Sequence, residues 1–281
     1  MVFVMGLILD VHSAKLYESW SRSPRGRAMD KFIEGLLLEF LEPQQYERAL
    51  DIGCGTGNHL LFLNKLGLDI NGVDASHYMI EIARNRLGAR CTLKTGMAED
   101  LPFDDNEFDL VVLINTLEFL DDPLKALREA GRVAKRKIFI GGINSLSWYG
   151  VGNKLQGLFL ETLSKYIRYY HLWELKSYIR RAYGPVPVIW RSEQTRPFFS
   201  NKIGGFLYNM CRLDGWPFGS YLGFSVTMEY RIKTDNLPLK IKVGKTDQPV
   251  AGGITTMDGI KERKFSKQLS RAEYNERGLF I

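Results

Sequence analysis

Residues 49–57 read Ala-Leu-Asp-Ile-Gly-Cys-Gly-Thr-Gly, and this stretch decides the fold. An apolar run predicts a strand over 48–52, and the pattern that follows predicts a helix over 58–66. The three glycines between them allow backbone with positive φ, which would expose the amides, and they carry no side chain to hold a ligand away. We therefore expect a strand, a glycine loop and a helix, with a bound molecule against the loop.

Outward from this loop, apolar runs and amphipathic patterns alternate along the chain. Apolar runs predict strands over 48–52, 70–73, 91–94, 108–114, 137–141, 186–190 and 220–232. Three-to-four-residue spacing predicts helices over 13–20, 24–41, 58–66, 76–87, 123–133, 155–170, 173–182 and 203–210. Parallel strands need crossovers of helix length, so the alternation predicts an α/β fold with a doubly wound, mostly parallel seven-stranded sheet. N-terminal helices precede this sheet, and a helical insertion comes late in the chain.

The composition is that of a globular protein with a packed core. The 281 residues are 45% hydrophobic and 25% charged, and no apolar run approaches the ~18–20 residues of a membrane span. Residues 1–9 lack the pattern of a signal peptide, and the cysteines, Cys54, Cys91 and Cys211, are too few for a disulfide framework. We expect a soluble protein in a reducing cytoplasm.

The glycine loop differs from two common nucleotide-binding motifs. Its third glycine comes one residue earlier than in a dinucleotide fingerprint, where Asn58 stands instead, and no Gly-Lys-Ser/Thr ending of a P-loop follows. Asp74 closes the second predicted strand, seventeen residues after Gly57. A carboxylate at that place can accept hydrogen bonds from both hydroxyls of a ribose, so we expect a ligand that contains one.

Further motifs make a family resemblance specific. Residues 96–103 read Gly-Met-Ala-Glu-Asp-Leu-Pro-Phe, residues 108–111 read Phe-Asp-Leu-Val, and residues 115–118 read Asn-Thr-Leu-Glu. With the glycine loop and Asp74, they resemble the class I S-adenosylmethionine-dependent methyltransferases, a Rossmann-like fold, over about residues 15–142. The chain is most similar to the branch that contains the ubiquinone and menaquinone biosynthesis methyltransferases.

The resemblance implies S-adenosyl-L-methionine as cofactor, with the glycines around its methionine part. Asp51 and the Asn115 carbonyl would meet its ammonium, Asp74 its ribose, and Ala75 and Met79 its adenine. The implied cofactor-binding residues are Asp51, Gly53, Cys54, Gly55, Gly57, Asp74, Ala75, Met79, Met97, Ala98, Glu99 and Asn115.

One position departs from the family pattern. The family usually has aspartate where this chain has Met97, and the Ala98 amide would meet the edge of the adenine ring. The exocyclic amine of adenine then loses its side-chain partner or takes Glu99 instead. A hydrogen bond to a charged group is typically worth ~1.5–3 kcal/mol, so the departure predicts a lower affinity.

The implied organisation is a methyltransferase domain over 1–232 followed by a basic C-terminal tail over 233–281. Within the domain, we expect an N-terminal helical lid, a cofactor-binding core, a helical substrate-side region and a last strand, over 1–45, 46–142, 143–215 and 216–232 respectively. Residues 135–191 carry ten Lys and Arg but only two Asp and Glu. Basic and aromatic residues together suit a small-molecule acceptor that is aromatic, quinone-like or lipid-like, and they allow peripheral contact with an anionic membrane.

The acceptor side is less defined than the cofactor side, and no metal is required. The candidate substrate contacts are Tyr17, Trp20, Trp148, Tyr149, Tyr170 and Arg191. His171 is the candidate general base because it lies among aromatic residues and titrates near neutral pH; the alternative is that it caps the following helix. The methylated atom, whether carbon, oxygen or nitrogen, stays open.

Three other functions remain as alternatives. A non-catalytic S-adenosylmethionine-binding accessory subunit would retain the glycine loop, and the Lys-rich tail would bind a partner protein. An RNA methyltransferase is less favoured because the basic excess is modest and we find no RNA-binding module in the sequence. An NAD-dependent oxidoreductase would bind nicotinamide, against which the glycine spacing argues.

Overall fold

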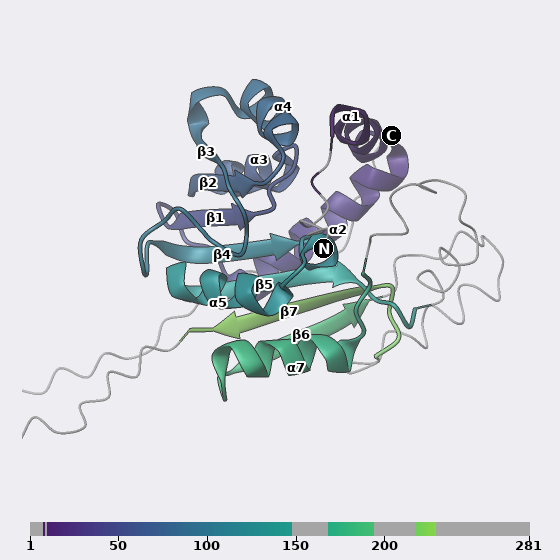
Figure 1. Cartoon of the computed structure of the whole chain (residues 1–281), viewed down its shortest axis with the longest axis vertical. Helices are drawn as coiled ribbons and strands as arrows, with labels where there is room; N and C mark the ends of the chain where they lie inside the picture. Colours follow the sequence, from purple (N-terminus) through teal and green to yellow (C-terminus); the bar gives the residue numbers. More distant parts are fainter. Residues whose placement is uncertain (1–7, 9, 148–167, 194–216, 229–281) are drawn as a thin grey trace, which may run out of the picture. The chain divides into compact units, whose positions relative to one another are not determined.

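The computed structural model describes residues 8, 10–147, 168–193 and 217–228, all within the unit Met1–Ile232. Helices and strands alternate along them (Figure 1). The described α-helices are α1 (Val11–Ser21), α2 (Pro24–Leu41), α3 (Asn58–Lys65), α4 (His77–Leu87), α5 (Pro123–Val133) and α7 (Leu172–Tyr183), and short 3₁₀ helices are η1 (Gly88–Arg90) and η2 (Leu117–Phe119). The strands are β1 (Arg48–Ile52), β2 (Asp69–Asp74), β3 (Cys91–Thr95), β4 (Phe108–Ile114), β5 (Ala134–Ile143), β6 (Val188–Glu193) and β7 (Tyr221–Thr227).

The strands form one seven-stranded sheet in the order β3-β2-β1-β4-β5-β7-β6. Strands β1 to β5 pair in parallel, whereas β7 is antiparallel to both β5 and β6. The predicted doubly wound, mostly parallel α/β sheet is therefore confirmed. Strand order reverses between β1 and β4, and ligands of such sheets bind beyond the carboxyl ends of the strands at this point.

Helices cover both faces of the sheet because alternate strand residues point to opposite sides. Leu50 and Ile52 pack in one apolar layer with α5 and α7, whereas Ala49 packs in the other with α2, α3 and α4. β4, buried at every position except Asp109, contributes Val111 and Leu113 to the first layer and Val112 to the second. The sheet is thus a rigid support, and the glycine loop after β1 leaves it at the carboxyl edge (Figure 1).

Helix ends follow local capping signals. Helix α2 begins at Pro24, and its first turn is capped by the Ser23 hydroxyl, which accepts a hydrogen bond from Gly26 N at 3.1 Å. Ser76 caps α4 as the sequence predicts, with Met79 N donating to its hydroxyl at 3.4 Å. The expected bounds 24–41, 48–52, 108–114 and 123–133 are those observed.

Some expectations differ from the structure or lie beyond its described part. β5 is longer than the expected 137–141 at both ends, because Ala134 pairs with Phe108 of β4 and Gly142 and Ile143 pair with β7. The helix expected over 155–170 does not include residues 168–170, where Tyr170 forms a β-bridge with Asn144. The rest of that helix, the helix over 203–210, the end of the last strand and the tail over 233–281 lie outside the described residues. No helix within the described ranges is both long and apolar enough to cross a bilayer.

Candidate active site

The three glycines of the loop between β1 and α3 all have left-handed backbone, but a side chain would meet different surroundings at each of them. Their φ angles are 74° at Gly53, 52° at Gly55 and 77° at Gly57. A Cβ at Gly53 would lie 2.5 Å from Thr116 Cγ2, and one at Gly57 would lie 2.9 Å from a side chain of α4. At Gly55 the nearest such atom is Tyr17 Cε1, at 3.9 Å. Gly53 and Gly57 therefore permit close packing within the protein, whereas a Cβ at Gly55 would make only an ordinary contact with the Tyr17 ring.

The loop amides anchor the loop to the rest of the protein. Gly53 N and Cys54 N both donate to Val73 O, at 2.8 and 3.1 Å, and Gly57 N donates to Cys54 O at 2.9 Å. These amides were expected to be exposed, and the structure corrects this: they are used internally. Burial also raises the pKa of the Cys54 thiol well above its usual value, which fits a packing role for that side chain. A ligand would thus contact Gly55 and the side chains around the loop, because the amides of Gly53, Cys54 and Gly57 already donate within the protein.

Asp74 at the end of β2 shapes the loop and retains capacity for a ligand. Gly55 N donates to its Oδ2 and Ser76 N to its Oδ1, both at 2.8 Å. An ionised carboxylate has about four acceptor sites, so these two bonds leave room for both hydroxyls of a ribose. Ala75 and Met79, expected to contact adenine, are placed by the same turn, and Met79 is buried in the first turn of α4.

Asp51 is a buried carboxyl that the protein does not fully satisfy. Only 1% of the residue is exposed, and its Oδ1 has no hydrogen-bond partner. Burial, and then the nearby charge of Asp74, raise its pKa to about 8. A cationic group placed beside Asp51 would favour its ionised form, so the site fits the ammonium of an amino acid ligand.

Tyr17 brings the N-terminal helices to the glycine loop. Its ring lies near Gly55, and burial together with the charges of Asp30, Asp51 and Asp74 raises the pKa of its hydroxyl. Trp20 is adjacent, with 5.8 Å between the two ring centroids, and is 40% exposed. The structure thus brings Tyr17 to the cofactor side of the site, whereas the sequence pointed to substrate.

Asp30 is a site residue that the sequence reading missed. It extends from α2 to the start of α3, where Asn58 Nδ2 donates to its Oδ2 at 3.2 Å. Burial, and then Glu34, raise its pKa to about 6. His59 Nε2 lies 3.8 Å from Asp30 Oδ1, but burial lowers the pKa of that histidine to about 4, so this contact is not an ion pair at neutral pH.

Arg86 of α4 ties helix α1 to the loop. Its guanidinium donates to both carboxylate oxygens of Glu18, at 2.7 and 2.8 Å, and to Thr56 Oγ1 at 3.2 Å. Both side chains of this ion pair are largely buried. A bidentate pair fixes orientation as well as distance, so it holds Tyr17, one residue before Glu18, over Gly55.

Residues after β3 form the other wall of the site. Met97 and Asp100 form a β-bridge, with Asp100 N donating to Met97 O at 3.2 Å, and Ala98 between them is buried. Glu99 Oε2 is buried with no hydrogen-bond partner. A free carboxylate oxygen here is consistent with Glu99 taking the place of the aspartate that Met97 replaces.

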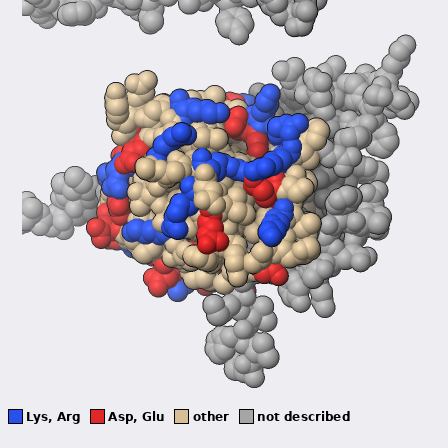
Figure 2. Space-filling model, turned by 90° about the horizontal axis from the view of Figure 1, so that it is seen from above, with Lys and Arg blue, Asp and Glu red and all other residues tan. Residues whose placement is uncertain are grey.

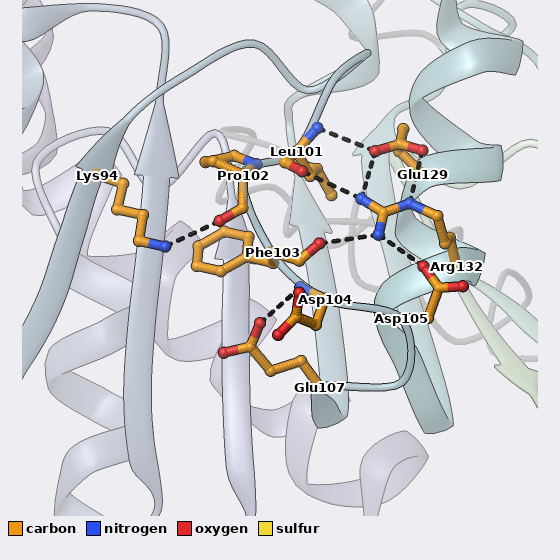
Figure 3. Close-up of polar contacts among 9 residues, drawn as sticks. All are labelled: Lys94, Leu101, Pro102, Phe103, Asp104, Asp105, Glu107, Glu129 and Arg132. Carbon is orange, nitrogen blue, oxygen red and sulfur yellow. Dashed lines mark hydrogen bonds and ion pairs between the residues drawn. The ribbon is translucent and has the colours of Figure 1, made fainter.

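Arg132 of α5 clamps the loop that follows this wall (Figure 3). Its NH1 and NH2 groups donate to the carbonyls of Phe103 and Leu101 at 2.8 and 3.0 Å, and it pairs with Asp105 and Glu129. Leu101 N in turn donates to Glu129 Oε2 at 2.9 Å. The position of the loop therefore depends on its contacts with α5, which lies about thirty residues further along the chain.

Arg132→Gln should destabilise the protein by about 1–3 kcal/mol, because two carbonyls and two carboxylates lose a charged donor. Urea unfolding of the variant measures this loss. Arg128→Gln, an exposed position on the same helix, is the control and should change the unfolding free energy by less than about 0.5 kcal/mol. Equal effects of the two substitutions would show that Arg132 does not hold the loop.

Asn115 and Thr116 follow β4 and complete the wall between β1 and β5. Thr116 Oγ1 donates to Ile52 O at 2.8 Å, joining the carboxyl ends of β1 and β4. Asn115 has a left-handed φ of 52°, its amide donates to Gly141 O, and its side-chain Oδ1 is buried without a hydrogen-bond partner. Thr116 therefore places this segment beside the end of β1, and the contact of the Asn115 carbonyl with the ammonium stays a prediction.

The other expected acceptor residues are not gathered at the loop. Arg191 on the edge strand β6 pairs with Glu39 of α2 at 2.6 Å. Tyr170 is 2% exposed, and its hydroxyl donates to Leu117 O at 3.3 Å. His171 caps α7, with Glu174 N donating to its Nδ1 at 3.2 Å, which is the alternative that the sequence left open. Trp148 and Tyr149 lie outside the described residues.

Comparison with known proteins supports what the motifs indicated. Residues 50–140 match the model of a methyltransferase domain. An uncharacterized protein of Methanocaldococcus jannaschii is 44% identical over 105 residues, which cover 37% of this chain and 48% of that protein. A demethylmenaquinone methyltransferase of Staphylococcus aureus is 38% identical over 93 residues, covering 31% of this chain and 39% of the enzyme. The chain thus spans less than half the length of the curated relatives it matches.

A solved structure extends the likeness beyond the motifs. The S-adenosylmethionine-dependent methyltransferase of Thermotoga maritima, a possible histamine N-methyltransferase, is 25% identical with a TM-score of 0.58. The match covers 78% of this chain and 97% of that one. Residues 50–140 thus match a methyltransferase domain, and the chain has the fold of the class I S-adenosylmethionine-dependent methyltransferases.

Proposed function

We propose that this chain transfers the methyl group of S-adenosyl-L-methionine to a small-molecule acceptor. The observation that carries the proposal is the glycine loop at the switch point: a Cβ at Gly55 would contact only Tyr17, while Asp51 is buried with an unsatisfied oxygen and Asp74 has spare acceptor capacity. This arrangement suits an adenosyl ribose joined to an amino acid. The side chains that surround the loop are acidic, and the ligand carries a sulfonium and an ammonium, so the charges are complementary.

The residues around the loop bind and orient in this proposal. When S-adenosyl-L-methionine is bound, it supplies a methyl carbon activated by the positive sulfur. Asp74 holds the ribose and Asp51 the ammonium, while Glu99 and the Ala98 amide meet the adenine. Tyr17, held by the Glu18–Arg86 pair, covers Gly55 and excludes water from that side.

We further propose an acceptor of aromatic, quinone-like or lipid-like character. Support comes from the demethylmenaquinone methyltransferase among the relatives and from the exposed Trp20 beside Tyr17. Figure 2 shows Lys and Arg interspersed with Asp and Glu on one face, rather than a continuous basic surface for a nucleic acid. Contact with a membrane and binding of a partner protein through 233–281 stay predictions, although one solved neighbour is in complex with a methyltransferase activator.

Asp74→Ala should weaken binding of S-adenosyl-L-homocysteine by about 1–3 kcal/mol, because a charged acceptor of two hydroxyls is lost. Isothermal titration calorimetry measures the change. Asp69→Ala, at the opposite end of β2 and on the surface, is the matched control and should leave Kd within twofold. If Asp74→Ala bound as tightly as the native chain, the ribose would have to lie elsewhere.

Turnover tests the enzyme against the accessory subunit. The purified full chain is incubated with S-adenosyl-L-methionine and panels of quinols, phenols, amines and fatty acids, and formation of S-adenosyl-L-homocysteine is measured. Turnover with any panel supports the proposed enzyme. Tight cofactor binding without turnover on every panel would favour the accessory subunit instead.

A further inference from the structure

Glu118 is a buried carboxyl that follows β4 at the carboxyl edge of the sheet. It lies in η2, directly after the β4 wall formed by Asn115 and Thr116. Only 4% of the residue is exposed. Its Oε1 accepts a hydrogen bond from Ile143 N at 3.1 Å, while its Oε2 is buried with no hydrogen-bond partner.

The end of β5 makes room for this carboxyl. A Cβ at Gly142 would lie 2.4 Å from Glu118 Oε1, so only glycine allows the side chain to rest there. Ile143 N then fixes one oxygen and leaves the other free. No Lys or Arg of the described ranges forms an ion pair with Glu118, and burial raises its pKa to about 7. A free buried carboxylate oxygen is costly unless something binds it.

The position of Glu118 along the carboxyl edge of the sheet determines which bound molecule, the cofactor or the acceptor, its side chain can contact. Asp74 follows β2 and the glycine loop follows β1, so the proposed ligand occupies these two strand ends, with the wall after β3 on its adenine side. β4 and β5 are the next strands along the sheet; Glu118 follows β4, and Ile143 is the last residue of β5. This is the side of the edge from which an acceptor can approach.

We propose that Glu118 Oε2 faces the transferred methyl group and takes the proton that the acceptor loses. The inference rests on the proposed function. As the lone pair of the acceptor atom bonds to the methyl carbon, the electrons of the broken carbon–sulfur bond stay on sulfur, and the acceptor proton passes to ionised Oε2. The acceptor is therefore a group that loses a proton when it is methylated: an N–H, an O–H or an acidic C–H group.

Glu118 also has a structural contact that a test must preserve. Its backbone carbonyl accepts from Arg168 N at 2.9 Å, which joins η2 to the segment before α7. Glu118→Gln retains this backbone contact, and its amide oxygen can still accept from Ile143 N. The substitution thus removes the charge while it keeps the shape, and S-adenosyl-L-homocysteine binding reports whether the cofactor site is intact.

The test compares two ligands that need no acceptor. S-adenosyl-L-homocysteine lacks the methyl group, whereas sinefungin has an amino group on carbon in place of the methylated sulfur. If Glu118 faces that position, the native full chain should bind sinefungin about tenfold or more tightly than S-adenosyl-L-homocysteine, since the amine gains a charged acceptor. In Glu118→Gln the preference should fall to twofold or less, with S-adenosyl-L-homocysteine affinity within twofold of native.

The control is Glu81→Gln on the exposed side of α4, which should keep the full preference. Glu118→Asp serves as a second variant: it keeps the charge but is one methylene shorter, so an intermediate preference is expected. An unchanged preference in Glu118→Gln, or no preference in the native chain, would overturn the role of Glu118 alone. Failure of the native chain to bind either ligand would instead overturn the proposed function.

Discussion

Gly55→Ala is expected to raise the Kd for S-adenosyl-L-homocysteine by about 10- to 100-fold, because the new methyl group enters the space that Gly55 opens to the ligand. The fold should survive, since the nearest protein atom to that Cβ is 3.9 Å away. The left-handed φ of 52° should cost about 1–2 kcal/mol of stability. Calorimetric titration and thermal unfolding measure the two effects separately.

Gly88 offers a control for the effect of backbone strain on binding. Its φ is 59° and its ψ −138°, a backbone conformation that L residues avoid, and nothing lies within 4 Å of its Cβ position. Gly88→Ala should therefore lose stability and yet leave ligand binding within twofold. If Gly55→Ala also left binding within twofold, the ligand would not lie against this part of the loop.

Binding of S-adenosyl-L-homocysteine at pH 7 is expected to release close to one proton. The pKa of Asp51 is raised to about 8 in the free protein, so about nine-tenths of that carboxyl is protonated at pH 7. Pairing with the ligand ammonium would favour the ionised form and expel the proton. Affinity should therefore rise about tenfold per pH unit between pH 6 and pH 7 and level off above pH 8.

The same shift predicts how the free protein depends on pH. Asp51 has a folded pKa above its usual 3.8, so the stability due to its protonated form is fully present below pH 3.8. That stability is lost progressively as the pH rises toward 8, by about 1.4 kcal/mol per pH unit. Urea unfolding between pH 5 and pH 8 measures this slope.

Calorimetry in buffers of different ionisation enthalpy counts the released protons. Asp51→Asn has no proton to release, so in this variant the count should fall by about 0.9 at pH 7. The variant also assigns the proton to Asp51 rather than to Asp30 or Glu118, whose pKa values are raised as well. Equal proton counts in the native chain and in Asp51→Asn would contradict the placement of the ammonium at Asp51.

Much of the fold could be predicted because its signals are local. Helix α2 starts at Pro24 after a Ser23 cap, and α5 starts at Pro123 after an Asp122 cap, so both sets of bounds agree with the pattern. β5 was underestimated because residues beyond its apolar run are strand through pairing with other strands: Ala134 with β4, and Gly142 and Ile143 with β7. Partners that lie tens of residues away leave no mark in a local window.

The site was predictable at the glycine loop but not around it. Asp30 lies on the same helical face as Gly26, Ile33 and Leu37, and a carboxyl in line with an apolar face is a signal that was available. The Glu18–Arg86 pair joins residues 68 positions apart, which no spacing rule detects. Glu118 was part of a quoted motif, but only the structure shows that its carboxyl is buried beside Ile143 N.

The central claim is that the glycine loop, Asp51 and Asp74 bind an adenosyl amino acid. Titration of the purified full chain with S-adenosyl-L-methionine, with NAD as the competing ligand, tests it most directly. We predict saturable binding of one S-adenosyl-L-methionine per chain, weakened about 10- to 100-fold in Gly55→Ala, and no detectable heat of binding from NAD. No binding of S-adenosyl-L-methionine, or binding of NAD in its place, would contradict the account.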